Sequence, residues 1–476
     1  WGEQEAKFKM ASLTKTSPEF RNFFIYNSTL GPKEGMEQEK ILLYLPIEED
    51  GEKKIRNVGL CEAIVKFTEQ FTPDKPCESV HTQKTRQVFY EPEKDCWMIM
   101  TVTIPFSEKV VDNGGKEPER HYHNEDVHDT VLHAVLKQTY QMFKLFNGSF
   151  QHIVSVCDLA ELRRRLEYFF GRYLSTINFS AVDILSVFSG IHFLPLNKNT
   201  FLKVSCFMNL IEHRFSCIEY TVFMFDDQIV WSGLEQEDMR VLYRYLTTSL
   251  IPVANEEWVI YDRQMVARGE NAISRNHRGR FVTCPSELTD EVRGPPRKLP
   301  RIFIEEEDGL KEFFLVVYQA LDAVVCMLVT VSDPPDKEFC KQLSGFVGPR
   351  LTNLANTIGD HKKKVTTVPD HEYRYVYFNH MNLAQKTTMH NKKQNQMCVS
   401  PEIIKIICNI NADFARANED GEVFMKTLTD CWVVGRKSDQ RELYVILHQK
   451  NANLIDVNEE VKRMTATHFS HIFFLD

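Results

Sequence analysis

The chain has 476 residues, which is too long for one ordinary hydrophobic core and corresponds to about three domains of roughly 100 to 200 residues. Apolar residues make up 43% and charged residues 26%, as in ordinary globular proteins, which excludes a collagen-like, repetitive or disordered chain. Lys and Arg total 57 against 66 for Asp and Glu. The resulting net charge of −9 repels phosphate backbones and argues against nucleic acid as a partner.

Cysteine usage predicts the compartment. The 12 cysteines include no C-x-x-C pair, and many of them lie inside apolar runs, as Cys326 and Cys408 do. This pattern is typical of buried free thiols in a reducing compartment and predicts a cytoplasmic protein. Residues 1–9 are polar and lack the pattern of a signal peptide.

One apolar stretch, residues 313–331, is long enough to raise the question of a membrane span. Gln319 and Asp322 lie in its middle, and an aspartate at the centre of a bilayer costs about 2.5 to 3.5 kcal/mol. We therefore predict two buried strands, 313–321 and 323–331, that turn at the aspartate.

The first third of the chain predicts a small mixed domain that opens with strands at 20–26 and 41–45. Four apolar residues then recur at helical spacing: Leu60, Ile64, Phe67 and Phe71. They predict a helix over about 58–71 with one apolar face. Single strands are expected at 80–90 and 96–104. A second helix is expected in which five apolar residues share a side: Val127, Val131, Val135, Met142 and Phe146.

Linking helices are expected over 156–212. One of them covers 159–177, where apolar residues follow a single stripe after Asp158, its expected N-cap. Residues 193–215 are also expected to be mainly helical.

The middle third, 213–362, repeats the same order of elements. Strands are predicted at 220–225 and 229–232, followed by a helix over 236–250. Residues 252–300 are polar and include Gly-Pro-Pro, which predicts a long insertion or mobile loop. After strands at 301–304 and in the 313–331 pair, a helix begins near Asp336, and Pro349 is expected to kink or end it.

The last third, 370–476, gives the pattern once more. It predicts a strand at 373–378, a helix from Pro401 with Ser400 as its N-cap, strands at 423–428, 431–435 and 442–447, and a final helix over 454–468. Three such blocks predict an α+β fold of three domains in series, each an antiparallel sheet flanked by helices, at 18–155, 213–362 and 370–476. After its first helix the first block has only two predicted strands, one fewer than each of the other blocks.

The short motifs of phosphate loops, dinucleotide folds, serine hydrolases and zinc proteases are absent from the sequence, so we predict no catalytic residue and no cofactor. One polar cluster contains enough imidazole and carboxylate for a metal: His121, His123, Glu125, Asp126, His128 and Asp129. This cluster keeps one enzymatic alternative open, a metal-dependent hydrolase. Its spacing mixes a strand-like H-x-H with a helical start, which favours a solvated loop without a metal.

Seven longer strings carry a resemblance to a known family. They are IRNVGLCEAIV (55–65), HTQKTRQ (81–87), KLFNG (144–148), WSGLEQEDMR (231–240), YLTTSL (245–250), YFNHMNLAQK (377–386) and KSDQRELYVILHQKNANLIDVNEEV (437–461). On these strings the chain closely resembles the Ccz-type vacuolar fusion proteins over nearly its whole length. Residues 252–300 and the histidine cluster take no part in the resemblance.

The resemblance implies three longin domains in series, in agreement with the three blocks. It also implies a subunit of a guanine-nucleotide exchange complex that activates the late-endosomal Rab GTPase in endosome maturation and in lysosome, vacuole and autophagosome fusion. The implied partners are a Mon-type longin subunit, a third scaffold subunit in animals, the late-endosomal Rab and an upstream endosomal Rab. Recruitment to late-endosome and lysosome membranes is implied to be peripheral, through acidic lipids.

Under this resemblance the first domain, 18–155, pairs with the first longin domain of the Mon-type subunit, and the pair binds the GTPase. We place the contacts on the solvent side of the first helix and the strand that follows it: Glu62, Lys66, Glu69, Gln83, Lys84, Arg86 and Gln87. Each is expected to act as a contact and not as an acid or base. Contact with the Mon-type subunit is an alternative to contact with the GTPase for each of them.

Two basic runs are candidates for contact with acidic lipids, although runs this short are more often solvated surfaces. They are Arg163, Arg164 and Arg165, and Lys362, Lys363 and Lys364. The alternative to the exchange function is a longin scaffold or tether that binds membranes and partners without changing nucleotide affinity.

Overall fold

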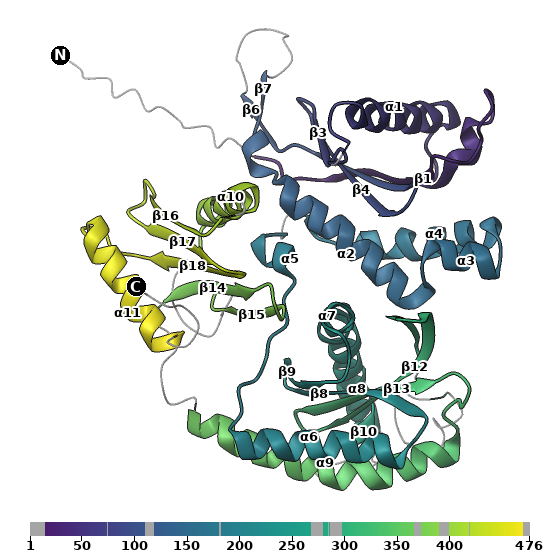
Figure 1. Cartoon of the computed structure of the whole chain (residues 1–476), viewed down its shortest axis with the longest axis vertical. Coiled ribbons are helices and arrows are strands. Elements are labelled where there is room, and N and C mark those ends of the chain that lie inside the picture. Colours follow the sequence, from purple (N-terminus) through teal and green to yellow (C-terminus); the bar gives the residue numbers. More distant parts are fainter. Residues whose placement is uncertain are drawn as a thin grey trace. The chain divides into compact units, whose positions relative to one another are not determined.

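The computed structural model of the chain describes residues 15–73, 75–109, 119–179, 182–267, 279–283, 285, 298–365, 373–389, 399–417 and 419–469. The chain divides into two compact units (Figure 1). One unit comprises Trp1–Tyr140 with Ile153–Val187, and the other comprises Gln141–His152 with Phe188–Asp476.

A five-stranded antiparallel sheet forms the centre of the first unit, with its strands in the order β2-β1-β5-β4-β3. The strands are β1 (Phe20–Asn27), β2 (Ile41–Leu45), β3 (Ser79–His81), β4 (Thr85–Glu93) and β5 (Cys96–Thr103). Helix α1 (Gly51–Glu69) covers one face of this sheet, and α4 (Leu159–Tyr173) packs against the other, where the rings of Phe23 and Phe170 lie 5.0 Å apart. Because both faces are covered, consecutive residues of β1 are buried rather than alternating ones.

The prediction that the first domain lacks a strand is wrong. Residues 80–90 form parts of β3 and β4, which are separated by a tight turn. The hydroxyl of Thr82 closes this turn by accepting a 2.9 Å hydrogen bond from the backbone N–H of Thr85. A side-chain hydrogen bond of this kind interrupts an extended run without any glycine or proline to mark it.

Further elements follow the first sheet. A separate hairpin consists of β6 (Phe106–Lys109) and β7 (Glu119–Tyr122), and the helices are α2 (Asp129–Asn147), α3 (Phe150–Val156) and α5 (Ile184–Phe188). Asp158 caps α4 as predicted, since its side chain accepts a 2.7 Å hydrogen bond from the N–H of Glu161. Helix α4 is shorter than predicted and ends at Tyr173, where a 3₁₀ turn (Leu174–Thr176) replaces its last residues.

The second sheet lies in the second unit and has the order β10-β12-β13-β8-β9, with β11 paired to β12. Its strands are β8 (Ile218–Phe225), β9 (Gln228–Ser232), β10 (Arg280–Phe281), β11 (Arg301–Glu306), β12 (Gly309–Ala320) and β13 (Ala323–Thr330). The predicted pair of strands in 313–331 is confirmed: β12 and β13 turn at Leu321 and Asp322. None of the helices within the described residues is both long and apolar enough to cross a bilayer.

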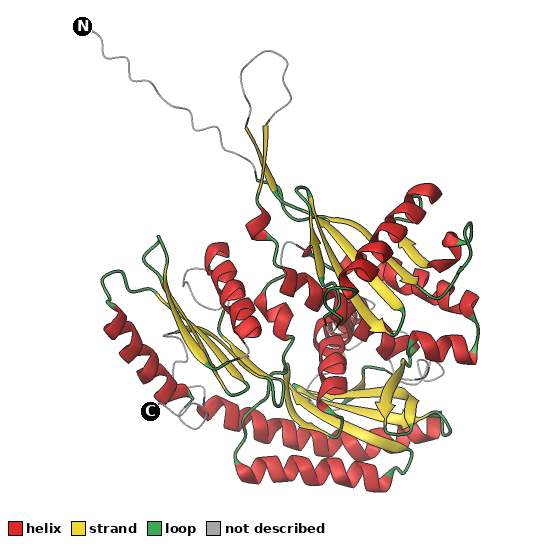
Figure 2. Cartoon of the chain, turned by 45° about the horizontal axis from the view of Figure 1, so that its top comes forward, coloured by secondary structure: helices red, strands yellow, loops and turns green. Residues whose placement is uncertain are grey.

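Helices cover both faces of the second sheet. Figures 1 and 2 show α6 (Lys198–Arg214) and α9 (Lys337–Val365) side by side on one face. On the other face lie α7 (Gln236–Tyr245), a π-helical turn (Leu246–Leu250) and α8 (Ile251–Ala267). The apolar side chains of α6 pack into the same core as those of α9, so α6 belongs to this domain, although the sequence placed it among the linking helices.

Two expectations for this region need correction. Residues 252–300 are not a loop throughout, because α8 continues from the π-helical turn to Ala267. Of the two outcomes expected at Pro349, the helix end is wrong, because α9 runs on through this exposed proline to Val365. The expectation that residues 193–215 are mainly helical is confirmed by α6, which begins at Lys198. Before the helix, Phe193 forms a parallel bridge with Ile229 of β9.

The third sheet repeats the order of the first, as β15-β14-β18-β17-β16. Its elements are β14 (Arg374–Asn379), β15 (Ala384–Thr387), α10 (Pro401–Ala417), β16 (Gly421–Lys426), β17 (Trp432–Ser438), β18 (Arg441–Leu447) and α11 (Leu454–His468). Gly435 lets α10 approach β17, since a Cβ at this position would lie 2.6 Å from Cγ2 of Ile410. The predicted fold class of three antiparallel sheets flanked by helices is confirmed.

Candidate partner-binding surface

Helix α1 has two apolar faces. It begins after Asp50, whose side chain accepts a 3.2 Å hydrogen bond from the N–H of Lys53. Val58, Cys61 and Val65 are buried against aromatic residues of the sheet. Because one apolar face already holds the helix on its domain, the second face is not needed for folding.

The second apolar face is the one that the helical spacing predicts, and it is half-buried at Ile64 but exposed at its three other residues. The exposed fraction is 57% for Leu60, 61% for Phe67 and 70% for Phe71. The rings of Phe67 and Phe71 lie 5.0 Å apart. We call Leu60 and Phe67 of α1, together with Phe71 in the turn just after the helix, the α1 stripe. A row of exposed large apolar side chains on a folded domain marks an interaction surface.

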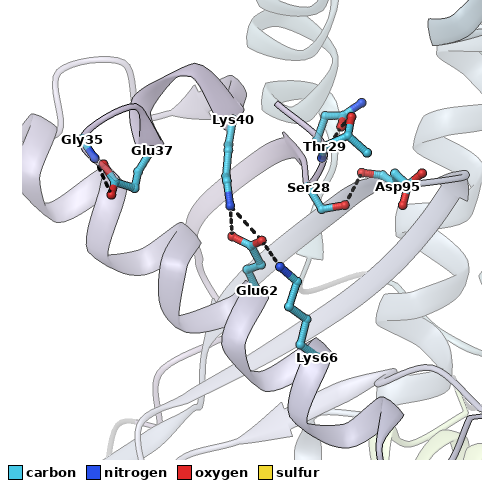
Figure 3. A network of polar contacts seen from close by, with 9 residues as sticks. Ser28, Thr29, Gly35, Glu37, Lys40, Glu62, Lys66 and Asp95 are labelled. Atoms are coloured by element: carbon cyan, nitrogen blue, oxygen red, sulfur yellow. Dashed lines mark hydrogen bonds and ion pairs between the residues drawn. The ribbon is translucent and has the colours of Figure 1, made fainter. Parts of the chain in front are cut away.

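Charged residues beside the α1 stripe form a compact network. The carboxylate of Glu62 accepts hydrogen bonds from Nζ of Lys40 at 2.8 and 2.9 Å and from Nζ of Lys66 at 2.6 Å (Figure 3). Burial alone raises the pKa of the Glu62 carboxyl, but the two lysines outweigh burial and hold the pKa below its ordinary value. Glu62 is buried, so the prediction that it lies on the solvent side is wrong.

Replacing Glu62 with glutamine is expected to lower the free energy of unfolding by about 2 kcal/mol, because Lys40 stays largely buried without its carboxylate. Urea unfolding at neutral pH measures this change. Since the pKa of Glu62 is lowered, the wild-type advantage should be present above about pH 4.3 and lost as the pH falls through the lowered pKa. Lys66→Ala is the control and should cost less than about 0.5 kcal/mol, because Lys66 is exposed. Equal losses of unfolding free energy in Glu62→Gln and Lys66→Ala would show that the buried pair of Glu62 and Lys40 is not the source of the stability.

The other five predicted contact residues differ in how exposed they are. Lys66, Glu69, Gln83 and Lys84 are exposed, and Gln87 is half-buried. They keep their status as predicted contacts with the partner or the GTPase.

Arg86 is buried, so its predicted position on the solvent side is wrong. Its guanidinium donates a 2.5 Å hydrogen bond to the carboxylate of Asp129, the first residue of α2, and Nη2 also donates to the carbonyl of Asn124 at 3.3 Å. Arg86 therefore joins β4 to the start of α2 and has a structural role.

Ser79, His81 and Asp129 meet beside Arg86 but do not form a nucleophilic triad. Oγ of Ser79 and Oδ2 of Asp129 both approach the same ring nitrogen, Nε2 of His81, at 3.3 and 2.6 Å. In a catalytic triad the imidazole uses one nitrogen for the nucleophile and the other for the carboxylate. The arrangement stabilises the junction of β3 and α2 and does not activate the serine.

The structure separates the members of the histidine cluster. Asp129 binds Arg86, Asp126 pairs with Lys15, and Nε2 of His123 lies 3.1 Å from Oγ of Ser107. Across the described ranges, no three His, Cys, Asp or Glu side chains are placed to hold a metal ion together. The geometry therefore gives a metal-dependent hydrolase no support.

The two basic runs are largely engaged inside the chain. Nη2 of Arg163 donates to the carbonyl of Glu39 at 2.9 Å, and Arg164 and Arg165 each donate to Glu161 at 2.7 Å. These two arginines lower the pKa of Glu161 to about 2. In the second run, Lys362 pairs with Asp226, and Nζ of Lys363 lies 4.0 Å from Oδ1 of Asp360. The side chain of Lys364 lies outside the described residues.

A groove of about 500 Å³ lies beside β2, the edge strand of the first sheet. Tyr44, Ile47 and Lys54 line one side, and Arg163 and Glu167 of α4 line the other. Its polar residues carry both signs of charge, which gives no preference for a charged small molecule.

Comparisons with known proteins identify the family. Residues 20–148 match the first longin domain of INTU, CCZ1 and HPS4, residues 218–348 match Intu longin-like domain 2, and residues 370–464 match Intu longin-like domain 3. The vacuolar fusion protein CCZ1 homolog of Nematostella vectensis is 56% identical over 98% of this chain and all of its own length. The homolog of Danio rerio is 49% identical over 97% of this chain and 96% of its own length. The homolog of Dictyostelium discoideum is 32% identical over 95% of this chain and 97% of its own length. The chain therefore belongs to the CCZ1 family of vacuolar fusion proteins, which are built from three longin domains.

Proposed function

We propose that this chain is one subunit of a guanine-nucleotide exchange complex that acts with a Mon-type longin subunit on the late-endosomal Rab GTPase. Its role would lie in endosome maturation and in the fusion of lysosomes, vacuoles and autophagosomes. Support comes from the relatives, which are named as vacuolar fusion proteins, and from the resemblance of the sequence strings to Ccz-type proteins. The α1 stripe is the observation that carries the proposal, because it gives this chain a surface for a partner.

Pairing through the α1 stripe has a clear energetic basis. Burying a large apolar side chain is worth about 1.5 to 3 kcal/mol, and Leu60, Phe67 and Phe71 are each more than half exposed. Phe67 and Phe71 also supply the aromatic anchors that dominate many interfaces. The exposed Lys66 and Glu69 lie on either side of Phe67 in sequence and would fix the register of the partner by charge.

Nucleotide exchange of this kind needs no acid, base or nucleophile. A complex that binds the nucleotide-free GTPase more tightly than the nucleotide-bound form must weaken the nucleotide by the same factor. Each tenfold shift requires about 1.4 kcal/mol of difference in contact energy between the two forms. Lys66, Glu69, Gln83, Lys84 and Gln87 would provide such contacts to the GTPase or to the Mon-type subunit.

Membrane recruitment would be peripheral and shared with other partners. These are an upstream endosomal Rab, a third scaffold subunit in animals, and acidic lipids that reach Arg163, Arg164, Arg165 and the lysines at 362–364. Because Arg164 and Arg165 already bind Glu161, lipid contact there would have to compete with an internal ion pair.

The affinity of the reconstituted pair for the Rab distinguishes exchange from passive scaffolding. We expect the pair to bind the nucleotide-free GTPase at least about 100-fold more tightly than the GDP-bound form, which corresponds to about 2.8 kcal/mol of differential contact. Titration calorimetry with both forms measures the ratio. Equal affinities would favour the alternative function, a longin scaffold or tether without effect on nucleotide.

A further inference from the structure

Helix α6 also carries apolar side chains on two faces. Its inner face buries Val204, Phe207, Met208 and Ile211 in the core of the second domain. On its outer face Leu202, Cys206 and Leu210 follow one another at intervals of four residues and are all exposed. At a rise of about 1.5 Å per residue this outer row extends about 12 Å along the helix.

The charged residues that α6 exposes are all basic, and they lie beside the uncharged Asn199, Phe201 and Asn209. Lys198, Lys203 and Arg214 are exposed, as is His213. The one acidic residue of α6 is Glu212, which is half-buried and accepts a 2.7 Å hydrogen bond from Oγ1 of Thr221. An exposed face without a carboxylate contrasts with the acidic chain as a whole, whose net charge is −9.

In the part of the chain that the structure describes, no carboxylate forms an ion pair with the exposed cations Lys198, Lys203 and Arg214. The Arg164 and Arg165 side chains differ in this respect, since both share Glu161. The free positive charge of α6 is therefore available to an external anion.

The neighbouring helix α9 adds a second unpaired guanidinium. Cζ of Arg214 lies 4.7 Å and Cζ of Arg350 lies 4.1 Å from the centre of the Phe346 ring, at the seam between α6 and α9. Nη1 of Arg350 donates to the carbonyl of Phe346 at 2.9 Å, and within the described residues no carboxylate neutralises it. The one ring therefore contacts both guanidinium groups, whose residues are exposed at the protein surface.

We propose that the outer face of α6, together with Arg350 of α9, is a docking surface for an acidic lipid bilayer. The leucines would enter the boundary between headgroups and acyl chains, and the lysines and arginines would bind lipid phosphates and carboxylates. Apolar side chains flanked by Lys and Arg, with no acidic residue on the same face, are the pattern by which helices lie in a membrane interface. An acidic protein surface would match the cations but would leave the protruding leucine row without its own complement.

This inference rests on the proposed peripheral recruitment and deepens it, because it adds lipid contacts on residues outside the two basic runs. Each lysine or arginine close to an acidic membrane contributes about 1 kcal/mol, or about fivefold in partitioning. Lys198 and Lys203 together would therefore contribute about 25-fold. Raising the salt concentration should weaken this part of the binding, because exposed charges are screened.

Sedimentation of the full chain with vesicles tests the surface without any GTPase. Wild type should bind phosphatidylcholine vesicles that contain phosphatidylserine at least tenfold better than vesicles of phosphatidylcholine alone. Leu202→Glu with Leu210→Glu should reduce binding to the acidic vesicles at least tenfold, and Lys198→Glu with Lys203→Glu at least about 25-fold. Thermal unfolding of each variant should stay close to wild type, since all four positions are on the exposed side of α6.

A matched control variant defines what would overturn the inference. Val253→Glu with Ile260→Glu places the same charges at similarly exposed apolar positions of α8, in the same domain, and should leave binding within twofold. Loss of binding in this control with retention in the α6 variants would place the lipid contact elsewhere. If the α6 variants still bind acidic vesicles but no longer bind the Mon-type subunit, this face is a protein interface. Either result would overturn the lipid-docking proposal. The exchange function would be unaffected, because it has its own test.

Discussion

Replacing Phe67 and Phe71 together with glutamate is expected to weaken pairing with the Mon-type subunit at least about 100-fold. In the free chain both side chains are mostly exposed, so the charges meet water and cost little stability. In the pair the same carboxylates would be removed from water without partners, which costs several kcal/mol. Titration calorimetry with the purified Mon-type subunit measures the affinity, and thermal unfolding of the variant checks its fold.

The matched control for this variant is Val156→Glu. Val156 ends α3 and is as exposed as Phe67 and Phe71, but it lies outside the α1 stripe. It should pair with wild-type affinity. If the double glutamate variant also pairs normally, the α1 stripe is not the pairing surface and the proposed arrangement of the first domains is wrong.

Replacing Glu442 with alanine is expected to destabilise the third domain by about 3 kcal/mol or more. Glu442 lies on β18 and is buried, where Oε2 accepts hydrogen bonds from Nδ2 of Asn411 at 2.9 Å and from the hydroxyl of Tyr444 at 2.6 Å. Oε1 lies 3.0 Å from Nε2 of His380. Alanine leaves buried polar groups of α10 and β18 without this acceptor.

Calorimetric unfolding should show a shift of at least about 12 °C in the transition of the third domain, given about 4 to 8 °C per kcal/mol for a domain of this size. Glu459→Ala on α11 is the control, because Glu459 is exposed, and it should shift the transition by no more than a few degrees. A comparable shift in both variants would show that the buried network of Glu442 contributes little.

The same network predicts a pH dependence. Burial alone raises the pKa of Glu442, but hydrogen bonds from His380, Tyr444 and Asn411 outweigh burial and hold it below the ordinary value. A lowered pKa in the folded state means that the stabilisation is complete above about pH 4.3 and is lost as the pH falls through the lowered pKa. The difference in stability between wild type and Glu442→Gln should therefore shrink below about pH 4. A constant difference down to pH 2 would contradict a lowered pKa.

Local patterns in the sequence predict most elements of the fold. Helix α11 spans the predicted residues 454–468, because Asn453 and Asp456 form a capping box and apolar residues recur along one side. The β12–β13 hairpin was predictable because an aspartate interrupts two runs of apolar and β-branched residues. Helix α8 was missed because its polar and acidic residues resemble those of a loop, and its stability comes from packing of Trp258 and Ala254 that the sequence does not reveal.

The candidate surface shows the limits of sequence periodicity. The spacing of Leu60, Phe67 and Phe71 locates an apolar face of α1 but does not say whether that face meets the sheet or solvent. Burial of Glu62 and Arg86 depends on Lys40 and Asp129, which lie far away along the chain and come together only in the folded domain. A charged residue in an isolated helix or strand has no local signal that predicts such a partner.

Release of a fluorescent nucleotide from the late-endosomal Rab, followed with this chain alone, with the Mon-type subunit alone and with both, measures directly whether exchange needs a pair of longin subunits. We predict acceleration only with both proteins, loss of that acceleration with Phe67→Glu and Phe71→Glu, and full acceleration with Val156→Glu. Acceleration by this chain alone, or binding of the Rab by the pair without any acceleration, would contradict the proposed function.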